Sequence, residues 1–183
     1  MNQNAMQRTV TRPESVSFLT RSSALGIVLV AHTSGGRALR AVQLGDDADT
    51  LRAELAERFP RATLVHEPRS PMGAQLADAV LRLLDAPGRA IDAPLDLRGT
   101  AFQQKVWNAL REIPVGSTAT YTEIARRIGS PNSVRAVAGA CAANPLALAV
   151  PCHRVVRSDG GLSGYRWGVE RKRTLLRLEG ALT

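Results

Sequence analysis

The chain has 183 residues, of which 44% are hydrophobic and 22% are charged. This length suits one large domain or two small ones, and the longest apolar run, the seven residues 25–31, is too short to cross a bilayer. Because the first fifteen residues also lack the apolar core of a signal peptide, we expect a cytoplasmic protein that has no membrane partner.

The positive charge is concentrated in the second half of the chain. Residues 1–97 contain eleven Arg and eleven Asp or Glu, whereas residues 98–183 contain thirteen Lys or Arg and five Asp or Glu, which accounts for the net charge of +8. A basic half beside a neutral half favours a polyanionic partner such as nucleic acid. The alternative, on charge alone, is a basic surface that binds nothing.

Cysteine and histidine residues are too few and too far apart in the sequence to form a disulfide scaffold or a metal site. The chain has two cysteines and three histidines, and no pair of cysteines has the spacing of a zinc finger. A disulfide is not expected either in a protein without an export signal. We therefore expect no metal, no disulfide and no cofactor.

The first half of the chain predicts a small α+β unit. Residues 1–15 are polar and lack periodicity, and we expect them to be disordered. The following segments are short apolar runs and stretches with helical spacing, separated by turn signals. They predict a hairpin of residues 25–32 and 38–44, a helix at 47–59, a strand at 62–65 and a helix at 70–84. Nothing in this unit indicates chemistry.

After a linker at residues 86–94, which holds two prolines and a glycine, the pattern becomes helical. The Thr-Ala-Phe-Gln of residues 100–103 and the Thr-Tyr-Thr-Glu of residues 120–123 are capping boxes, and each predicts the start of a helix. A third helix is predicted to begin after Ser130, with Pro131 at its first helical position.

The second and third of these helices, joined by a tight turn at Gly129, resemble a helix-turn-helix. The outer face of the third helix carries small residues beside Arg135, namely Ala136, Gly139, Ala140 and Ala143. A helix that reads sequence in the major groove presents long polar side chains. A smooth face with a single arginine therefore favours close approach to a narrow groove without sequence readout. The alternative is an ordinary alanine-rich core helix.

The pair Cys152-His153, preceded by Pro151, is the candidate nucleophile and base. A thiol is an effective nucleophile only as the thiolate, and a neighbouring imidazole can accept its proton directly or through a water. Because adjacent residues of a regular strand point to opposite faces, we expect an irregular turn here. The alternative is a buried cysteine with a chance histidine beside it.

Three features around this pair support a built site. Asn144 ends the third helix eight residues before Cys152, and the glycine-rich, aromatic segment 159–168 is suited to cover a flat ring. Glu179 falls on the apolar face of the last helix, where a carboxylate is costly unless it is paired, and His153 is the expected partner. The sequence thus predicts a Cys–His–Glu relay, with a solvated C-terminal turn as the alternative for Glu179.

The segment Pro151-Cys152-His153-Arg154-Val155 resembles the active-site signature of the O6-alkylguanine-DNA alkyltransferases, also called methylated-DNA--protein-cysteine methyltransferases. The resemblance runs from about residue 98 to residue 180. Residues 98–104 and 162–168 are most similar to the bacterial adaptive-response (Ada) branch of that family.

The resemblance implies both fold and activity. The fold is α+β, with a small ribonuclease-H-like α/β domain at residues 16–92 and a mainly helical, winged-helix-like DNA-binding and catalytic domain at residues 93–183. The activity is direct-reversal DNA repair: one transfer per molecule of an alkyl group, mainly methyl, from O6 of guanine to Cys152, with O4 of thymine as a further substrate. The implied partner is double-stranded DNA, bound through its minor groove by a monomer.

The resemblance also implies a role for each matched residue. Cys152 accepts the alkyl group, His153 takes the thiol proton through a water, and Glu179 orients His153. Asn144 holds the turn, and Tyr121 protonates the leaving base. Arg135 fills the gap that the flipped nucleotide leaves in the DNA stack. The other implied DNA contacts are Tyr121, Thr122, Ala136 and Gly139, and the implied pocket residues are Val155, Tyr165, Arg166 and Trp167.

The chain departs from the family pattern at three points. It has no cysteine-rich N-terminal segment, so the phosphotriester-sensing and transcriptional roles of some relatives are not expected. The N-terminal domain has no cysteines, so the zinc site of other relatives is not expected. Ala147 and the bulky Trp167 stand where relatives have proline and glycine, which predicts a pocket that accepts methyl well and benzyl poorly.

Three rival functions are open to the same sequence. An alkyltransferase-like protein would bind damaged DNA without reacting, but Cys152 is present. A helix-turn-helix transcription factor would need base-reading side chains that the third helix lacks. A cysteine hydrolase would usually take its histidine from elsewhere in the fold.

Overall fold

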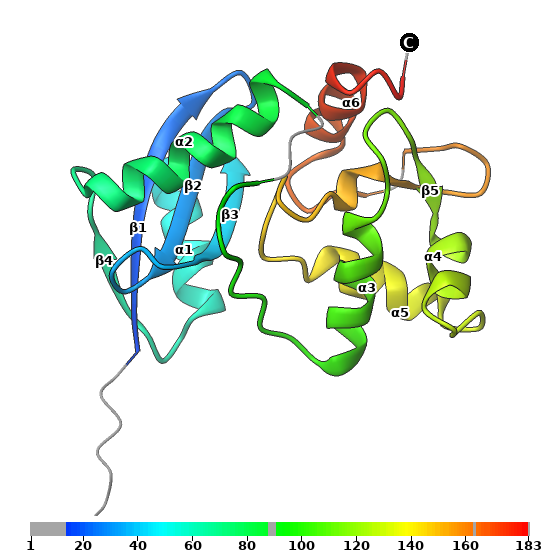
Figure 1. Ribbon diagram of the computed structural model, residues 1–183, viewed down its shortest axis with the longest axis horizontal. Coiled ribbons are helices and arrows are strands. Elements are labelled where there is room, and N and C mark those ends of the chain that lie inside the picture. Colours follow the sequence, from blue (N-terminus) through cyan, green and yellow to red (C-terminus); the bar gives the residue numbers. More distant parts are fainter. Residues whose placement is uncertain (1–13, 88–90, 163, 183) are drawn as a thin grey trace, which may run out of the picture.

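A computed structural model describes residues 14–87, 91–162 and 164–182. A four-stranded sheet with two helices is followed by short helices grouped around a small second sheet (Figure 1). In chain order the elements are β1 (Ser15–Ser23), β2 (Gly26–Thr33), β3 (Leu39–Gly45), α1 (Ala48–Arg58), β4 (Thr63–His66), α2 (Pro71–Asp85), α3 (Ala101–Arg111), β5 (Ala119–Thr120), α4 (Tyr121–Arg127), α5 (Val134–Ala142), the short 3₁₀ turn Cys152–Arg154, β6 (Val155–Val156) and α6 (Val169–Leu178).

The large sheet has the strand order β3-β2-β1-β4, in which β1 is antiparallel to β2 and parallel to β4. The predicted hairpin is confirmed as β2 and β3. Strand β1 was not predicted, because its second half, residues 20–23, is polar and interrupts the apolar pattern. The expectation that disorder extends to residue 15 is wrong for Glu14, whose carbonyl accepts from Thr63 N and whose side chain pairs with Arg98 at 2.9 Å, and for Ser15, which begins β1 and pairs with β4. The rest of that expectation concerns residues 1–13, which lie outside the described residues.

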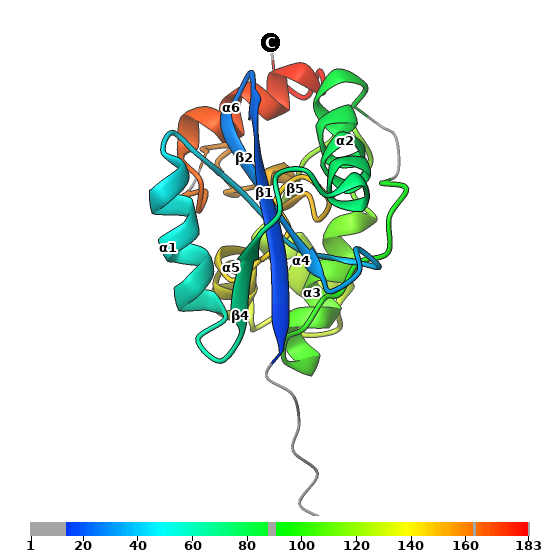
Figure 2. The same ribbon diagram turned by 90° about the vertical axis from the view of Figure 1, so that its left-hand side faces the viewer.

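The two helices of this half cover opposite faces of the sheet, as Figure 2 shows with the sheet between them. Helix α1 packs Leu51 and Leu55 against one face, and α2 packs Leu76 and Val80 against the other. Both helices begin at a capped residue, since the side chain of Asp47 accepts from Thr50 N and that of Ser70 accepts from Gly73 N. The predicted helices at 47–59 and 70–84 are thus confirmed.

The helical half contains both predicted capping boxes, at the starts of α3 and α4. The predicted start of the third helix is wrong, because Pro131 lies in a turn that Ser133 N closes on Ser130 O, and α5 begins only at Val134. Ala140 does not lie on the outer face either. It is 3% exposed, and its carbonyl accepts from the indole Nε1 of Trp107 in α3. In the described part of the chain no helix is both long and apolar enough to cross a bilayer.

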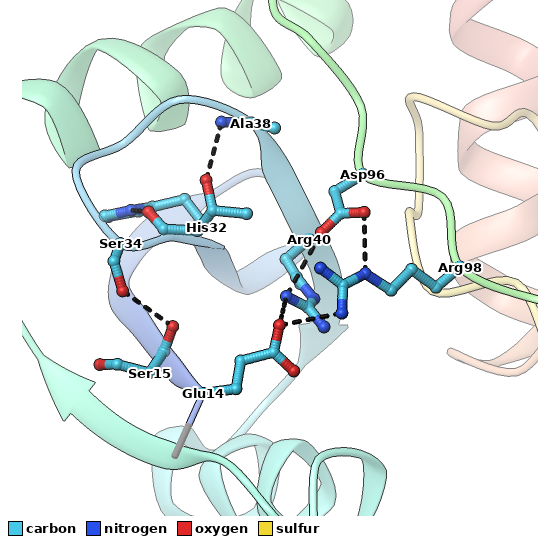
Figure 3. Close-up of polar contacts among 9 residues, drawn as sticks. Glu14, Ser15, His32, Ser34, Ala38, Arg40, Asp96 and Arg98 are labelled. Atoms are coloured by element: carbon cyan, nitrogen blue, oxygen red, sulfur yellow. Dashed lines mark hydrogen bonds and ion pairs between the residues drawn. The ribbon is translucent and has the colours of Figure 1, made fainter. Parts of the chain in front are cut away.

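The open edge of β3 is covered by backbone from the second half of the chain. Leu39 N donates to Pro94 O at 2.8 Å, and Val42 N donates to Pro145 O at 2.9 Å. Figure 3 shows the side-chain network beside this edge, in which the buried Arg40 pairs with Glu14 and with Asp96. One hydrophobic core is therefore shared by the two halves, and the division into two domains at residues 92 and 93 stays a prediction.

Candidate active site

Cys152 opens a 3₁₀ turn, so the irregular backbone predicted for this segment is present. The chain then enters β6, which pairs in parallel with β5, and Ala119 lies opposite Val155. Tyr121 is the first residue of α4, directly after β5. This pairing of two short strands therefore brings the start of α4 beside the segment that follows the thiol.

His153 and Glu179 are in direct contact. His153 Nε2 lies 3.0 Å from Glu179 Oε1, and both side chains are buried. Glu179 also accepts two hydrogen bonds from Arg154, from Nε at 2.9 Å and from Nη2 at 2.8 Å. Sequence reasoning gave Arg154 no role in the relay, although its place in the same motif could have suggested one.

Arg154 and His153 keep Glu179 ionised. Burial alone would raise the pKa of Glu179, but hydrogen bonds from these two residues and their charges outweigh it and lower the pKa to about 2. Burial also lowers the pKa of His153, against the opposing effect of Glu179. With Nε2–H donating to Glu179, the buried Nδ1 is the nitrogen left to accept a proton, and it has no hydrogen-bond partner among the described residues.

The thiol of Cys152 is 5% exposed, and this burial raises its pKa to about 11. Two side chains oppose the burial effect, together with a backbone hydrogen bond of Cys152 itself: the amide of Asn144, whose Nδ2 donates to Sγ at 3.1 Å, and the charge of Lys172. Asn144 also holds the loop before the cysteine, because Nδ2 donates to Val150 O at 2.8 Å and Oδ1 accepts from Leu146 N at 2.9 Å. The structure thus places Asn144 both in the turn and on the sulfur.

Lys172 is a site residue that the sequence analysis missed. It is fully buried on α6, and its Nζ donates to Val155 O at 2.5 Å. The signal was available, because Lys172 shares the apolar face of α6 with Leu175 and Glu179 at helical spacing. A buried lysine needs partners as much as a buried carboxylate does.

Two aromatic rings belong to the same core cluster as Cys152. Tyr165 is edge-on to His153 at a centroid distance of 6.4 Å, and Trp167 is edge-on to Tyr165 at 5.1 Å. Tyr165 Oη and Trp167 Nε1 are buried without a hydrogen-bond partner in the described chain. The side chain of Arg166 turns instead to α1, where it pairs with Glu54 at 3.8 Å. Of the predicted pocket residues, Val155, Tyr165 and Trp167 join the core around the thiol.

The predicted DNA-contact residues lie on α4 and α5. Arg135, Ala136 and Gly139 are exposed along one face of α5, and Thr122 is half-buried. A Cβ atom added at Gly139 would meet nothing within 4 Å, so the space over this face is open. Tyr121 belongs with the core cluster rather than with the open face, as a partly buried side chain packed against it.

The second cysteine, Cys141 of α5, does not share the reactive setting of Cys152. Neither cysteine forms a disulfide. Burial raises the pKa of Cys141 to about 12, which leaves it a small apolar side chain in the core. The described residues contain no group of three or more His, Cys, Asp or Glu suited to a metal ion.

Comparison with known proteins gives a consistent result. Residues 101–181 match the family model described as 6-O-methylguanine DNA methyltransferase, DNA binding domain. The chain is 50% identical to the bifunctional transcriptional activator/DNA repair enzyme Ada of Escherichia coli, over 90% of this chain and 46% of that protein. It is 43% identical to the inducible methylated-DNA--protein-cysteine methyltransferase of Bacillus subtilis, over 67% of this chain and 68% of that protein.

A solved structure extends the likeness to the fold. The crystal structure of Mycobacterium tuberculosis OGT in complex with DNA aligns with a TM-score of 0.74 at 36% identity, covering 90% of this chain and 93% of that one. The mixed α+β fold is thereby confirmed. The chain spans 46% of the length of Ada and 53% of the mycobacterial methyltransferases, about half of the first curated relatives it matches.

Proposed function

The chain belongs to the family of methylated-DNA--protein-cysteine methyltransferases, and on that basis we propose that it repairs alkylated DNA by direct reversal. In this proposal an alkyl group, mainly methyl, moves from O6 of guanine to Cys152, and O4 of thymine is a further substrate. The observation that carries the proposal is the sulfur of Cys152, which lies in hydrogen-bond contact with Asn144 and next to the His153–Glu179 pair.

The transfer is a displacement at the alkyl carbon. The thiol proton passes to His153 Nδ1 through a water, the sulfur forms the new C–S bond, and the C–O6 bond breaks with its electrons leaving on the base. Tyr121 supplies a proton to that base, and the proton that His153 took from the thiol replaces the one that Tyr121 lost. Glu179 and Arg154 keep the imidazole oriented. The product is a thioether, which none of the described site residues is placed to cleave, so in this proposal each molecule reacts once.

The site stabilises negative charge on sulfur with one amide and one ammonium group. The Asn144 N–H and the Lys172 charge both lower the pKa of Cys152, while burial raises it. In the closed site burial prevails, so the thiol is protonated. We propose that the incoming base displaces the rings of Tyr165 and Trp167, which share the core cluster with Cys152, and so exposes the sulfur to water and to the relay.

We propose the exposed face of α5 as the DNA contact. A target base must leave the stack to reach a buried thiol, and the small residues Ala136 and Gly139 permit close approach of the helix to a minor groove. Arg135, exposed at the second position of α5, would fill the gap in the stack. Tyr121 and Thr122 add contacts from α4. The protein is proposed to act as a monomer in the cytoplasm.

The finer description of the fold is also a proposal. The order β3-β2-β1-β4, with three antiparallel strands followed by a parallel one, supports a ribonuclease-H-like domain at residues 16–92. The helix-turn-helix of α4 and α5, together with the β5–β6 pair, supports a winged-helix-like domain at 93–183.

The test is intact mass before and after incubation with DNA that contains O6-methylguanine. The protein should gain about 14 Da, the difference between a methyl group and a hydrogen, on Cys152 and only once. Cys152→Ala should bind the same DNA and gain nothing. An unmodified wild-type protein at saturating damaged DNA would contradict the proposal, and repeated turnover of DNA, an ester or an amide would favour a hydrolase.

A further inference from the structure

The end of helix α5 is held by a side chain from the other half of the chain. Arg58, the last residue of α1, donates from Nη2 to the carbonyl of Ala143 at 2.5 Å. Ala143 is the C-cap residue of α5, and the last turn of α5 has no basic residue of its own. A cation at a helix C-terminus satisfies a carbonyl that the helix leaves unbonded and favours the negative end of the helix dipole.

The backbone just after this cap is held by the same half of the chain. Pro145 O accepts from Val42 N at 2.9 Å, and Ala147 N donates to Val42 O at 3.0 Å. Both bonds go to β3. The edge of the large sheet and the end of α1 therefore both hydrogen-bond to the backbone of residues 143–147. In Figure 1, β3 lies directly beside the loop that leaves α5.

Asn144 lies within residues 143–147, and its side chain contacts Cys152. Its Nδ2 donates to Cys152 Sγ at 3.1 Å and to Val150 O at 2.8 Å. A continuous set of contacts therefore runs from Arg58, through the Ala143–Asn144 backbone, to the reacting sulfur.

Arg58 is well suited to act through this contact alone. It is half-buried and makes no ion pair with any described residue. Burial lowers the pKa of Arg58, and the charge of Arg166 adds to that effect. A guanidinium buried in this way costs free energy; the bond to the Ala143 carbonyl offsets part of that cost, as does its place in the last turn of α1.

We propose that Arg58 is a positioning residue for the alkyl transfer: by capping α5 it fixes the Asn144 amide against the Cys152 sulfur. The proposal rests on the proposed function, and it gives the N-terminal half a part in the reaction. Without the cap, Asn144 would sample other orientations and the thiolate would lose its hydrogen-bond donor.

The experiment compares Arg58→Met, Arg58→Lys and a control. Methionine keeps an apolar side chain of similar reach but cannot donate, and lysine keeps one donor and the charge. Arg58→Met should slow single-turnover methyl transfer by roughly tenfold, the usual effect of a lost hydrogen bond from a charged donor, and Arg58→Lys should recover part of that loss. Arg52→Met is the matched control, since Arg52 is an exposed α1 residue whose one ion pair among the described residues is with Asp49, and it should react at the wild-type rate.

The second readout is the pH dependence of Cys152 alkylation by iodoacetamide, which needs neither DNA nor the transfer reaction. Of the titratable groups that couple electrostatically with this sulfur, Lys172 of α6 lowers its pKa, while the charge of the sulfur raises the pKa values of Cys141 of α5 and Tyr165 of the loop before α6. His153 is next to it in the 3₁₀ turn. Arg58→Met should shift the profile to higher pH. A merely structural effect would lower the melting temperature of the variant without moving the profile.

A double-variant cycle decides whether Arg58 acts through Asn144. In an Asn144→Ala background, Arg58→Met should change the iodoacetamide profile no further. Additive effects, or a wild-type profile for Arg58→Met, would overturn the inference even if the wild-type protein transfers methyl. Failure of the wild-type protein to transfer methyl would instead overturn the proposed function.

Discussion

The side chain of Lys172 shows how burial and charge act together on the nucleophile. It has no exposed surface and donates to Val155 O, in the segment just after the cysteine. Its charge lowers the pKa of Cys152, while the thiol's own burial raises that pKa. The burial of Lys172 lowers the pKa of its own ammonium group, and the charges of Cys141 and Cys152 oppose that shift.

Lys172→Met should therefore slow methyl transfer. Methionine retains the length of the side chain and its apolar packing but removes the charge. We expect the pKa of Cys152 to rise and the rate at neutral pH to fall by about tenfold for each pKa unit. The measurement is the single-turnover rate of transfer as a function of pH, with Arg173→Met on the more exposed side of α6 as the control. A variant profile that matches the wild type would show that Lys172 does not act on the sulfur.

Trp167 sets the room available beside the thiol. Its ring is buried against Tyr165, which in turn contacts His153. Trp167→Gly should raise the rate of reaction with free O6-benzylguanine, because the removed ring leaves space for the benzyl group. Removing a large buried ring also costs about 3–5 kcal/mol of stability, so rates must be compared at a temperature where the variant is folded. Unchanged reactivity of the folded variant would refute a steric role.

Sequence reasoning found the side chains whose chemistry is unusual for their setting. A cysteine beside a histidine and a glutamate on an apolar stripe each pointed to the site, and the structure joins His153 to Glu179. Arg154 and Lys172 were missed although both carried a signal, since Arg154 belongs to the same motif as Cys152 and Lys172 lies on the apolar face of α6. The contacts of Arg58 could not be predicted at all, since they join residues 85 positions apart.

Helix α5 has one buried face and one exposed face that carries mostly small side chains. Val137 and Cys141 are buried, while Ala136 and Gly139 are open to solvent. Of the residues that the sequence placed on the outer face, Ala136 and Gly139 are exposed, Ala143 is half-buried, and packing against Trp107 draws Ala140 inward. The start of α5 was misplaced because proline is common both at the first turn of a helix and in the turn before it.

Gly139→Leu tests the smooth face without disturbing the fold. A side chain at this position meets open space, and leucine favours the helix more than glycine does, so stability should be unchanged or higher by about 0.5–1 kcal/mol. We expect affinity for DNA to fall at least tenfold, because the leucine would keep the helix from the groove floor. Affinity is measured by fluorescence anisotropy with undamaged duplex. Gln75→Leu on the exposed side of α2 is the control, and equal affinities for the two variants would argue against contact through this face.

The two halves of the molecule are held together by a shared core and by ion pairs across their boundary. The core cluster that contains Cys152 also contains Val42 of the sheet and Val80 of α2. Arg171 of α6 donates to Leu25 O at 2.8 Å and pairs with Asp46 at 2.5 Å. Most elements followed from periodicity and capping, and the fold class of the whole chain followed from the family resemblance, but this joining depends on long-range contacts that leave no local pattern. The active site is therefore built on the whole fold, and its ionised groups should contribute to global stability.

Glu179 gives that contribution a defined pH dependence. Its pKa in the folded protein is about 2, below the ordinary value of 4.5. A carboxyl group whose pKa is lowered by folding stabilises the fold fully above its unfolded pKa and loses that effect as the pH falls toward the folded value. The side chain is 7% exposed, so the contribution at neutral pH is on the order of 3 kcal/mol.

The difference in unfolding free energy between the wild-type protein and Glu179→Gln isolates this effect from the other carboxylates. Urea denaturation at about pH 7 should show the variant less stable by that amount, since Arg154 and His153 lose their shared anion. The gap should narrow between about pH 4.5 and about pH 2, where the wild-type carboxyl group takes up its proton. Glu57→Gln, an exposed change on α1, should show no such trend. If the difference in unfolding free energy stays constant down to low pH, the packing of Glu179, and not its charge, holds α6 against the 3₁₀ turn Cys152–Arg154.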